Sequence, residues 1–97
     1  MAEPDEIIHQ SMRLKIMAAL NASARGDWLE FTRLKSLTGA TDGNLGAHIE
    51  TLSKADYIAV EKRFEGKRPQ TRVKITPEGR KAFAGHVAYL RGILDSE

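Results

Sequence analysis

The sequence contains no cysteine and no long apolar run. The absence of cysteine excludes a disulfide framework, a thiolate metal site and a cysteine nucleophile. No apolar stretch approaches the roughly 20 residues that a membrane-spanning helix needs. The first ten residues, MAEPDEIIHQ, are acidic where a secretion signal would be basic. We therefore expect a cytoplasmic protein without a membrane segment.

The usual motifs of catalytic and nucleotide-binding sites are also missing. The three histidines, His9, His48 and His86, lie far apart and form no HxxxH or HExxH pattern. There is no lysine-containing phosphate loop, no GxGxxG after an expected strand, and no serine in a nucleophile elbow. We therefore expect no enzymatic activity, no cofactor and no metal site.

The length and composition indicate one globular domain. Ninety-seven residues suffice for a modest hydrophobic core. Hydrophobic residues make up 41% of the chain and charged residues 29%, which is typical of a soluble protein. No repeat, low-complexity tract or linker divides the sequence, so we treat residues 1–97 as a single domain.

Apolar residues recur at helical spacing in the N-terminal part of the chain. They predict a first helix over residues 7–22. The short apolar segment Trp28–Phe31 predicts a brief strand or an extended link. Thr32 is expected to cap a second, short helix over residues 32–38, which Gly39 closes.

A third helix is predicted over residues 42–55, with Thr41 or Asp42 as its N-cap. Its buried stripe follows the i, i+4, i+7 pattern and consists of Leu45, Ile49 and Leu52. Because only a tight turn separates it from the second helix, the two helices form a helix-turn-helix.

The period then changes from helical to two. Residues 57–76 predict a β-hairpin with its turn over residues 65–69. The sequence Thr76-Pro77-Glu78 is typical of a helix start, and a last helix is expected over residues 77–94. The resulting fold class is α+β, mostly α: a winged helix-turn-helix with a C-terminal dimerisation helix.

The hairpin is strongly basic. The segment from Lys62 to Lys74 holds six basic residues and one acid, Glu65, a net charge of +5 in a chain whose net charge is +2. Such a block is expected to attract an anionic partner, and nucleic acid is the first candidate. The alternative is a charged hairpin that is only solvated.

The exposed arc of the third helix is small and polar. We predict that it enters the major groove of double-stranded DNA and reads bases through Asn44, Ala47, His48 and Thr51. Gly43 and Gly46 weaken the helix, and close approach to DNA would explain them. The alternative is that they allow close packing on the preceding helix.

Another set of residues is expected to contact the DNA backbone, which positions a protein without reading sequence. These residues are Thr41, Gly43, Lys54, Arg63, Lys67, Arg68 and Arg72.

The terminal helices carry more apolar positions than one small domain can cover. We therefore expect a homodimer, since exposed apolar patches usually mark interfaces. The predicted interface residues are Ile8, Phe83, Val87, Tyr89, Leu90, Ile93 and Leu94. The alternative is that both termini pack on the core of their own domain.

Several segments are also characteristic of a known group of proteins. They are RLKIM at residues 13–17, FTRLK at 31–35, TDGNLGAHI at 41–49, GKRPQT at 66–71 and ITPEGR at 75–80. With them the chain resembles the small winged-helix transcriptional regulators of bacteria and archaea, relatives of the MarR and ArsR families. The resemblance implies a dimer that binds operator DNA, with the helix from Asp42 to Lys54 in the major groove and residues 65–70 as the wing.

This resemblance does not extend to metal sensing, because ArsR-like metal sensors use cysteine or clustered histidine ligands. The chain is also shorter than the MarR relatives that bind small aromatic ligands, and its sequence identifies no effector. Two other functions stay open: a protein-interaction module that docks through the terminal helices, and an RNA-binding winged helix.

Overall fold

The structure is a computed structural model that describes residues 3–23 and 27–96. Along the chain come α1 (Ser11–Ala22), β1 (Leu29–Glu30), α2 (Phe31–Thr38), α3 (Asp42–Lys54), β2 (Ile58–Glu65), β3 (Arg68–Ile75) and α4 (Pro77–Asp95). The predicted winged helix-turn-helix fold is confirmed.

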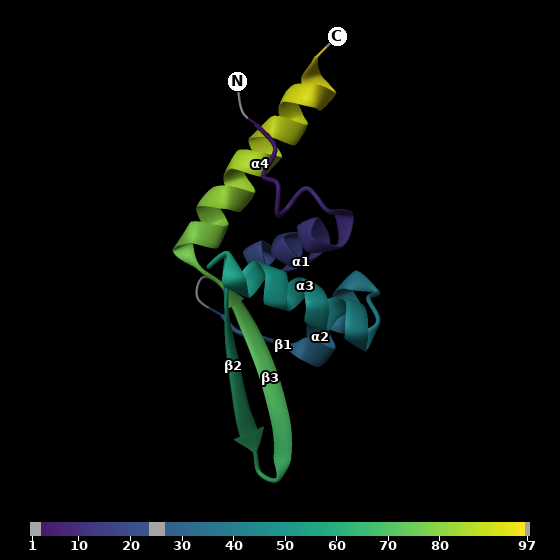
Figure 1. The fold of residues 1–97 in the computed structure, drawn as a ribbon, viewed down its shortest axis with the longest axis vertical. Helices are drawn as coiled ribbons and strands as arrows, with labels where there is room; N and C mark the ends of the chain where they lie inside the picture. Colours follow the sequence, from purple (N-terminus) through teal and green to yellow (C-terminus); the bar gives the residue numbers. More distant parts are fainter. Residues whose placement is uncertain (1–2, 24–26, 97) are drawn as a thin grey trace.

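The three helices α1 to α3 form a central body, and two elements project from it in opposite directions (Figure 1). The β2–β3 ribbon is the wing, and it extends well beyond the helices. The outer half of α4 extends the other way. This arrangement gives the molecule its elongated dimensions of 55 × 25 × 22 Å.

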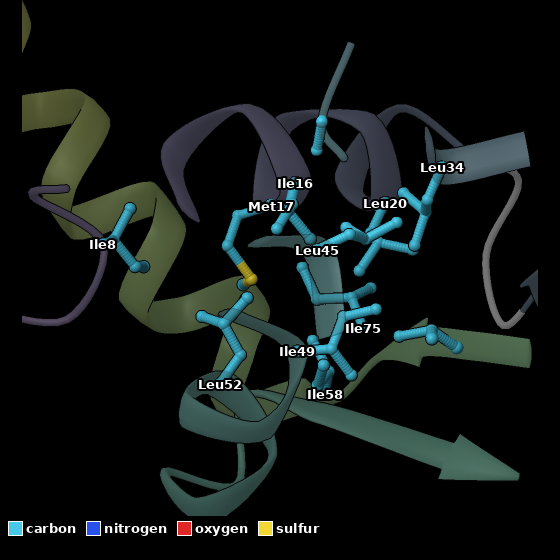
Figure 2. Packing of buried hydrophobic residues seen from close by; sticks show 12 residues of the cluster. Ile8, Ile16, Met17, Leu20, Leu34, Leu45, Ile49, Leu52, Ile58 and Ile75 are labelled. Carbon is cyan, nitrogen blue, oxygen red and sulfur yellow. The ribbon is translucent and has the colours of Figure 1, made fainter. Parts of the chain in front are cut away.

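The core lies where the helical body meets the base of the sheet (Figure 2). The predicted stripe of α3 is confirmed, because Leu45 and Leu52 are fully buried and Ile49 is 6% exposed. Burying each such side chain contributes about 1.5–3 kcal/mol. The stripe packs against buried residues of the other elements: Ile16, Met17, Leu20, Leu34, Ile58, Val73 and Ile75.

The sheet is antiparallel with strand order β1-β3-β2. The brief strand predicted at residues 28–31 exists, since Leu29 pairs with Val73. In the hairpin, pairing continues outward to Glu65 and Arg68. The turn is therefore limited to two residues and is shorter than the predicted turn over residues 65–69. Gly66 supplies its left-handed backbone, with φ of 65°.

The helix α1 begins at Ser11, four residues later than the prediction. The reason is local hydrogen bonding. The Asp5 carboxylate accepts hydrogen bonds from the backbone N–H groups of Ile7 and Ile8, both at 2.9 Å, and forms a separate turn. The side chain of Gln10 then caps the true helix start.

Three further predictions about helix starts have different outcomes. Thr32 was expected to cap α2, but that helix begins at Phe31 and Glu30 occupies its N-cap position without a side-chain hydrogen bond. For α3 the open choice resolves to Thr41, whose Oγ1 accepts a hydrogen bond from Asn44 N at 3.2 Å. The predicted start of α4 is confirmed, with Thr76 as its cap.

Candidate nucleic-acid interface

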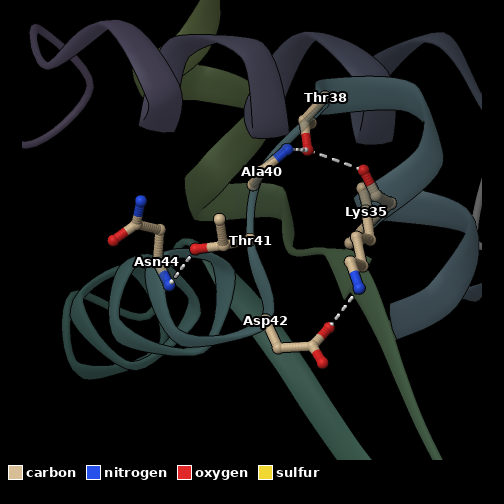
Figure 3. Close-up of polar contacts among 7 residues, drawn as sticks. Lys35, Thr38, Ala40, Thr41, Asp42 and Asn44 are labelled. Carbon is tan, nitrogen blue, oxygen red and sulfur yellow. Dashed lines mark hydrogen bonds and ion pairs between the residues drawn. The ribbon is translucent and has the colours of Figure 1, made fainter.

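The turn between α2 and α3 is fixed by short-range hydrogen bonds (Figure 3). Thr38 Oγ1 donates to Leu34 O at 2.7 Å and accepts from Ala40 N at 3.4 Å. Gly39 provides the left-handed backbone that ends α2, with φ of 73°. Since Thr41 then caps α3, the direction of α3 relative to α2 is set within a few residues.

An ion pair balances the charge at the start of α3. Asp42 suits a helix N-terminus, but its carboxylate would repel a phosphate backbone nearby. Lys35 Nζ lies 2.8 Å from Asp42 Oδ1 and offsets that charge. In Figure 3 the side chain of Asn44 points away from this pair and from the turn. This role of Lys35 was not predicted from the sequence.

The four predicted base-reading residues share the outward face of α3 but differ in exposure. Asn44 and Ala47 are exposed, whereas His48 and Thr51 are half-buried. The hydroxyl of Thr51 donates to Ala47 O at 3.2 Å. It therefore presents its methyl group and oxygen lone pairs outward, and not a free donor.

Arg13 of α1 holds His48. Its Nη1 lies 3.2 Å from His48 Nδ1, and its Nε donates to Ile7 O. Because an arginine only donates, Nδ1 must accept, which leaves Nε2–H as the donor of the imidazole. Arg13 thus positions a residue of α3 from 35 residues away in the sequence. No local pattern could have indicated this contact.

The glycines of α3 are not explained by packing within the chain. A Cβ built at Gly43 or at Gly46 would meet no atom of another described element within 4 Å. The alternative that they permit close approach of the preceding helix is therefore wrong. Gly79 of α4 shows the contrast, because a Cβ there would collide with the carbonyl oxygen of Tyr57.

The tip of the wing exposes Lys67 and Arg68, as predicted. Behind the tip, Arg63 Nε donates to Gln70 Oε1 at 2.7 Å, and Gln70 Nε2 donates to Glu65 Oε2 at 3.0 Å. Glu65 thus orients Arg63 indirectly, through Gln70. These contacts stiffen the ribbon and keep Arg63 exposed along its edge.

Arg72 plays a structural part that differs from its predicted role. Its Nη2 lies 2.8 Å from Glu61 Oε1, and its side chain is only 24% exposed. The guanidinium carbon lies 4.6 Å from the centre of the Trp28 ring, and Lys74 Nζ lies 4.8 Å from it. Trp28 thus joins β1 to the outer face of β3 through cation–π contacts.

Lys54, at the end of α3, pairs with Glu50 at 3.1 Å, and both side chains are well exposed. Such a pair contributes about 0.3–0.5 kcal/mol, so Lys54 can exchange it for a phosphate contact at low cost. Beside the pair, a groove separates α3 from the wing. Its lining includes Gly46, Ser53, Val60, Lys62 and Thr71.

Residues 12–94 match the winged helix DNA-binding domain family. The chain belongs to this family. It is a family of DNA-binding domains and not of enzymes, in agreement with the prediction from the sequence.

Relatives of this winged helix domain include an uncharacterised protein of Methanocaldococcus jannaschii, 33% identical over 82 residues, which span 84% of this chain and 86% of the relative. A transcriptional regulator homologue from Pyrococcus horikoshii OT3 is similar in structure, with a TM-score of 0.81 and 27% identity over 92% of this chain and 85% of that one.

A candidate MarR-family transcriptional regulator from Porphyromonas gingivalis W83 has a TM-score of 0.71 at 16% identity, over 94% of this chain and 85% of that one. At this identity the likeness concerns the fold. The predicted resemblance to small winged-helix transcriptional regulators is confirmed by the family match and by the archaeal structure.

The winged helix domain has a second notable surface on α4. The first half of this helix packs on the body, with Phe83 against the core cluster. The second half leaves the body, and Ile93 and Leu94 are 52% and 80% exposed. Val87, Tyr89 and Leu90 lie between Phe83 and Ile93 in the sequence and are half-buried.

Among the residues 3–23 and 27–96, no helix is long and apolar enough to cross a membrane.

One predicted interface residue lies elsewhere. Ile8 is fully buried and lies beside α4 in its own chain (Figure 2). The segment around it is fastened to α4, because Asp5 N donates to the buried Nδ1 of His86 at 3.0 Å. Ile8 therefore has no surface to offer a second subunit, and the prediction for it is wrong.

Asp5 also links this segment to the sheet. Tyr57 Oη donates to Asp5 Oδ2 at 2.6 Å. Burial, followed by this hydrogen bond, raises the pKa of Tyr57 to about 12. The neutral phenol is thus the form that the fold favours, and the N-terminal segment is part of the domain.

Proposed function

We propose that this protein is a cytoplasmic, homodimeric transcriptional regulator that binds double-stranded DNA at specific sequences. In this proposal α3 lies in the major groove and the wing contacts the backbone or the minor groove. The observation that carries it is the outward face of α3. Gly43 on this face and Gly46 in the groove beside the wing leave space that no described residue outside their own helix fills. The basic wing projects next to α3 (Figure 1).

The proposed contacts follow the exposure of the side chains. Asn44, Ala47, His48 and Thr51 read bases from α3. The backbone is held by Thr41, Gly43, Lys54, Arg63, Lys67 and Arg68. Arg72 is left out of this set, because Glu61 and Trp28 already engage its guanidinium.

We propose that the outer half of α4 forms the dimer interface. Its exposed Ile93 and Leu94, and the half-buried Val87, Tyr89 and Leu90, supply the apolar surface, with a part of Phe83. A second copy related by twofold symmetry would cover the same residues on both chains. It would also present two copies of α3 to successive turns of DNA.

Replacing Asn44 with alanine tests the base-reading assignment. The variant should lose discrimination at one base pair of the site, by about 1–3 kcal/mol for a bidentate contact. Competition with duplexes mutated one base pair at a time measures this. Lys67→Ala is the matched control, since it should weaken binding to all duplexes alike. An Asn44→Ala variant with unchanged base preference would contradict the assignment.

A second function, a protein-interaction module, is favoured by the same exposed end of α4. It would leave the basic wing and the glycines of α3 without a role, so we rank it below DNA binding. Absence of binding to any duplex, with capture of a partner through Ile93 and Leu94, would support it.

A further inference from the structure

We propose that Phe64 and Pro69 form an apolar wedge at the wing tip, and that this wedge enters the DNA minor groove next to the major groove occupied by α3. This inference rests on the proposed function and names a contact beyond the basic residues. Phe64 is 73% exposed and faces Pro69 across the ribbon. Pro69 is exposed as well.

The wedge faces the side of the wing on which α3 lies. Alternate residues of a strand face the same side of a sheet. Val60 and Lys62 line the groove between the wing and α3. Phe64 follows in the same alternation, so its ring is directed toward that side and beyond the helix. A DNA duplex bound to α3 would therefore meet this face of the wing.

The length of the wing is of the same order as the spacing of the grooves. From Val60 in the groove to Phe64 in the wedge there are four residue steps of β2. At about 3.3 Å per residue, the wedge lies roughly 13 Å further along. B-form DNA repeats every ~34 Å, so a major groove and the adjacent minor groove are displaced by about half of this, roughly 17 Å.

The positive charge at the wing tip also favours contact with the minor groove. Lys67 and Arg68 are exposed beside the ring, and the structure assigns no acidic partner to either within the described residues 3–23 and 27–96. Cations are attracted to the negative potential of a narrow minor groove. Phenylalanine and proline are among the apolar residues that proteins insert there, where they partly unstack a base step.

A lone exposed apolar residue on a protein surface is ordinary and needs no explanation. Here two apolar residues pair near the end of the ribbon, on the face that lines the groove beside α3. The ring also pairs with Pro69 across the strands, which by itself stabilises the ribbon. The experiment must separate this structural role from contact with DNA.

The test compares Phe64→Thr, Phe64→Leu and Lys67→Ala on a duplex that the wild type binds specifically. Threonine keeps the strand propensity but removes the ring, so affinity should fall about tenfold at every salt concentration with an unchanged salt dependence. Leucine keeps an apolar tip and should retain most of the affinity. Lys67→Ala should instead reduce the salt dependence.

A second readout follows base stacking. With 2-aminopurine placed in the flanking minor-groove steps, wild-type binding should raise its fluorescence, and Phe64→Thr should abolish the rise. Equal affinity of Phe64→Thr and wild type, or no fluorescence rise with the wild type, would overturn the wedge alone. Equal losses in Phe64→Thr and Phe64→Leu, in step with lower melting temperatures, would assign Phe64 to ribbon stability and also overturn it. If the wild type fails to distinguish any duplex from its scrambled version, the proposed function itself fails.

Discussion

At the residue scale, Gly46 links stability and function most directly. Glycine in the middle of a helix costs about 1 kcal/mol relative to alanine. No atom of another described element lies within 4 Å of the place where its Cβ would be, so packing does not require the residue. A partner that approaches the helix backbone would require it. A substitution at Gly46 should therefore raise the stability of the fold and lower its affinity for DNA.

Gly46→Ala is expected to raise the free energy of unfolding by about 0.5–1 kcal/mol, because alanine favours the helix. DNA affinity should fall at the same time, because the new methyl group lies in the groove between α3 and the wing, which bound DNA would cover. Chemical denaturation and DNA titration measure the two effects. Gly85→Ala in α4 is the control, since its Cβ also meets no atom within 4 Å. It should stabilise the fold and leave affinity unchanged, and equal affinities for both variants would contradict the docking of α3.

Residue patterns in the sequence were sufficient to predict the contacts that are local or that follow the period of a helix. Leu45, Ile49 and Leu52 follow from helical spacing, and Asn44 follows as a member of the opposite arc. The contact of Arg13 with His48 and the packing of Arg72 on Trp28 join distant segments. Such pairs depend on how the elements pack, so a single sequence gives no signal for them.

At the scale of elements, the wing is the part whose role is most easily isolated. Its basic tip is separated from the helical body by the length of the ribbon (Figure 1). Changes at the tip should therefore alter DNA contact without disturbing the core. The period-two pattern predicted this ribbon, but it could not define the two-residue turn, because Arg68 and Pro69 suit either a turn or a strand.

Removing both Lys67 and Arg68 by alanine substitution should lower affinity for all duplexes alike. The slope of log affinity against log salt concentration should flatten by about 0.9 for each lost phosphate contact. Anisotropy titrations over a range of salt concentrations measure the slope. The control is Lys81→Ala with Arg91→Ala, two exposed residues of α4, the helix that extends away from the wing (Figure 1). If the tip variant and the control show the same slope as the wild type, the wing does not contact DNA.

The start of α1 shows why element boundaries are harder to predict than elements. Residues 7–22 have helical periodicity, yet Asp5 closes a separate turn and Gln10 starts the helix. The two possible starts differ by only a few hydrogen bonds. Packing of the N-terminal segment on His86 and Tyr57 decides between them, and this packing is invisible in local sequence.

At the scale of the whole molecule, the exposed end of α4 determines the expected assembly. The sequence predicted excess apolar surface on both terminal segments. In the structure only the end of α4 exposes such a surface, whereas the N-terminal segment is packed on the domain. Ile8 is inside the domain, while Leu94 is 80% exposed. The domain thus covers its N-terminal segment by itself and leaves the end of α4 uncovered.

Ile93→Asp combined with Leu94→Asp should convert a dimer into a monomer, since two carboxylates cannot be buried at an apolar interface without a large penalty. Light scattering should give about twice the 10.8 kDa chain mass for the wild type and a single chain mass for the variant. Leu37→Asp, at a half-exposed leucine of α2, is the control and should leave the dimer intact. A wild type that is monomeric at micromolar concentration would contradict the proposed interface.

The most direct test of the central claim is fluorescence anisotropy with two duplexes, the DNA upstream of the protein's own coding sequence and a scrambled version of it. Titrations at about 50 and about 200 mM salt separate specific binding from charge attraction. We expect binding at the higher salt to persist on the upstream duplex only. Equal binding to both duplexes that collapses at the higher salt would contradict a sequence-reading regulator of its own upstream DNA.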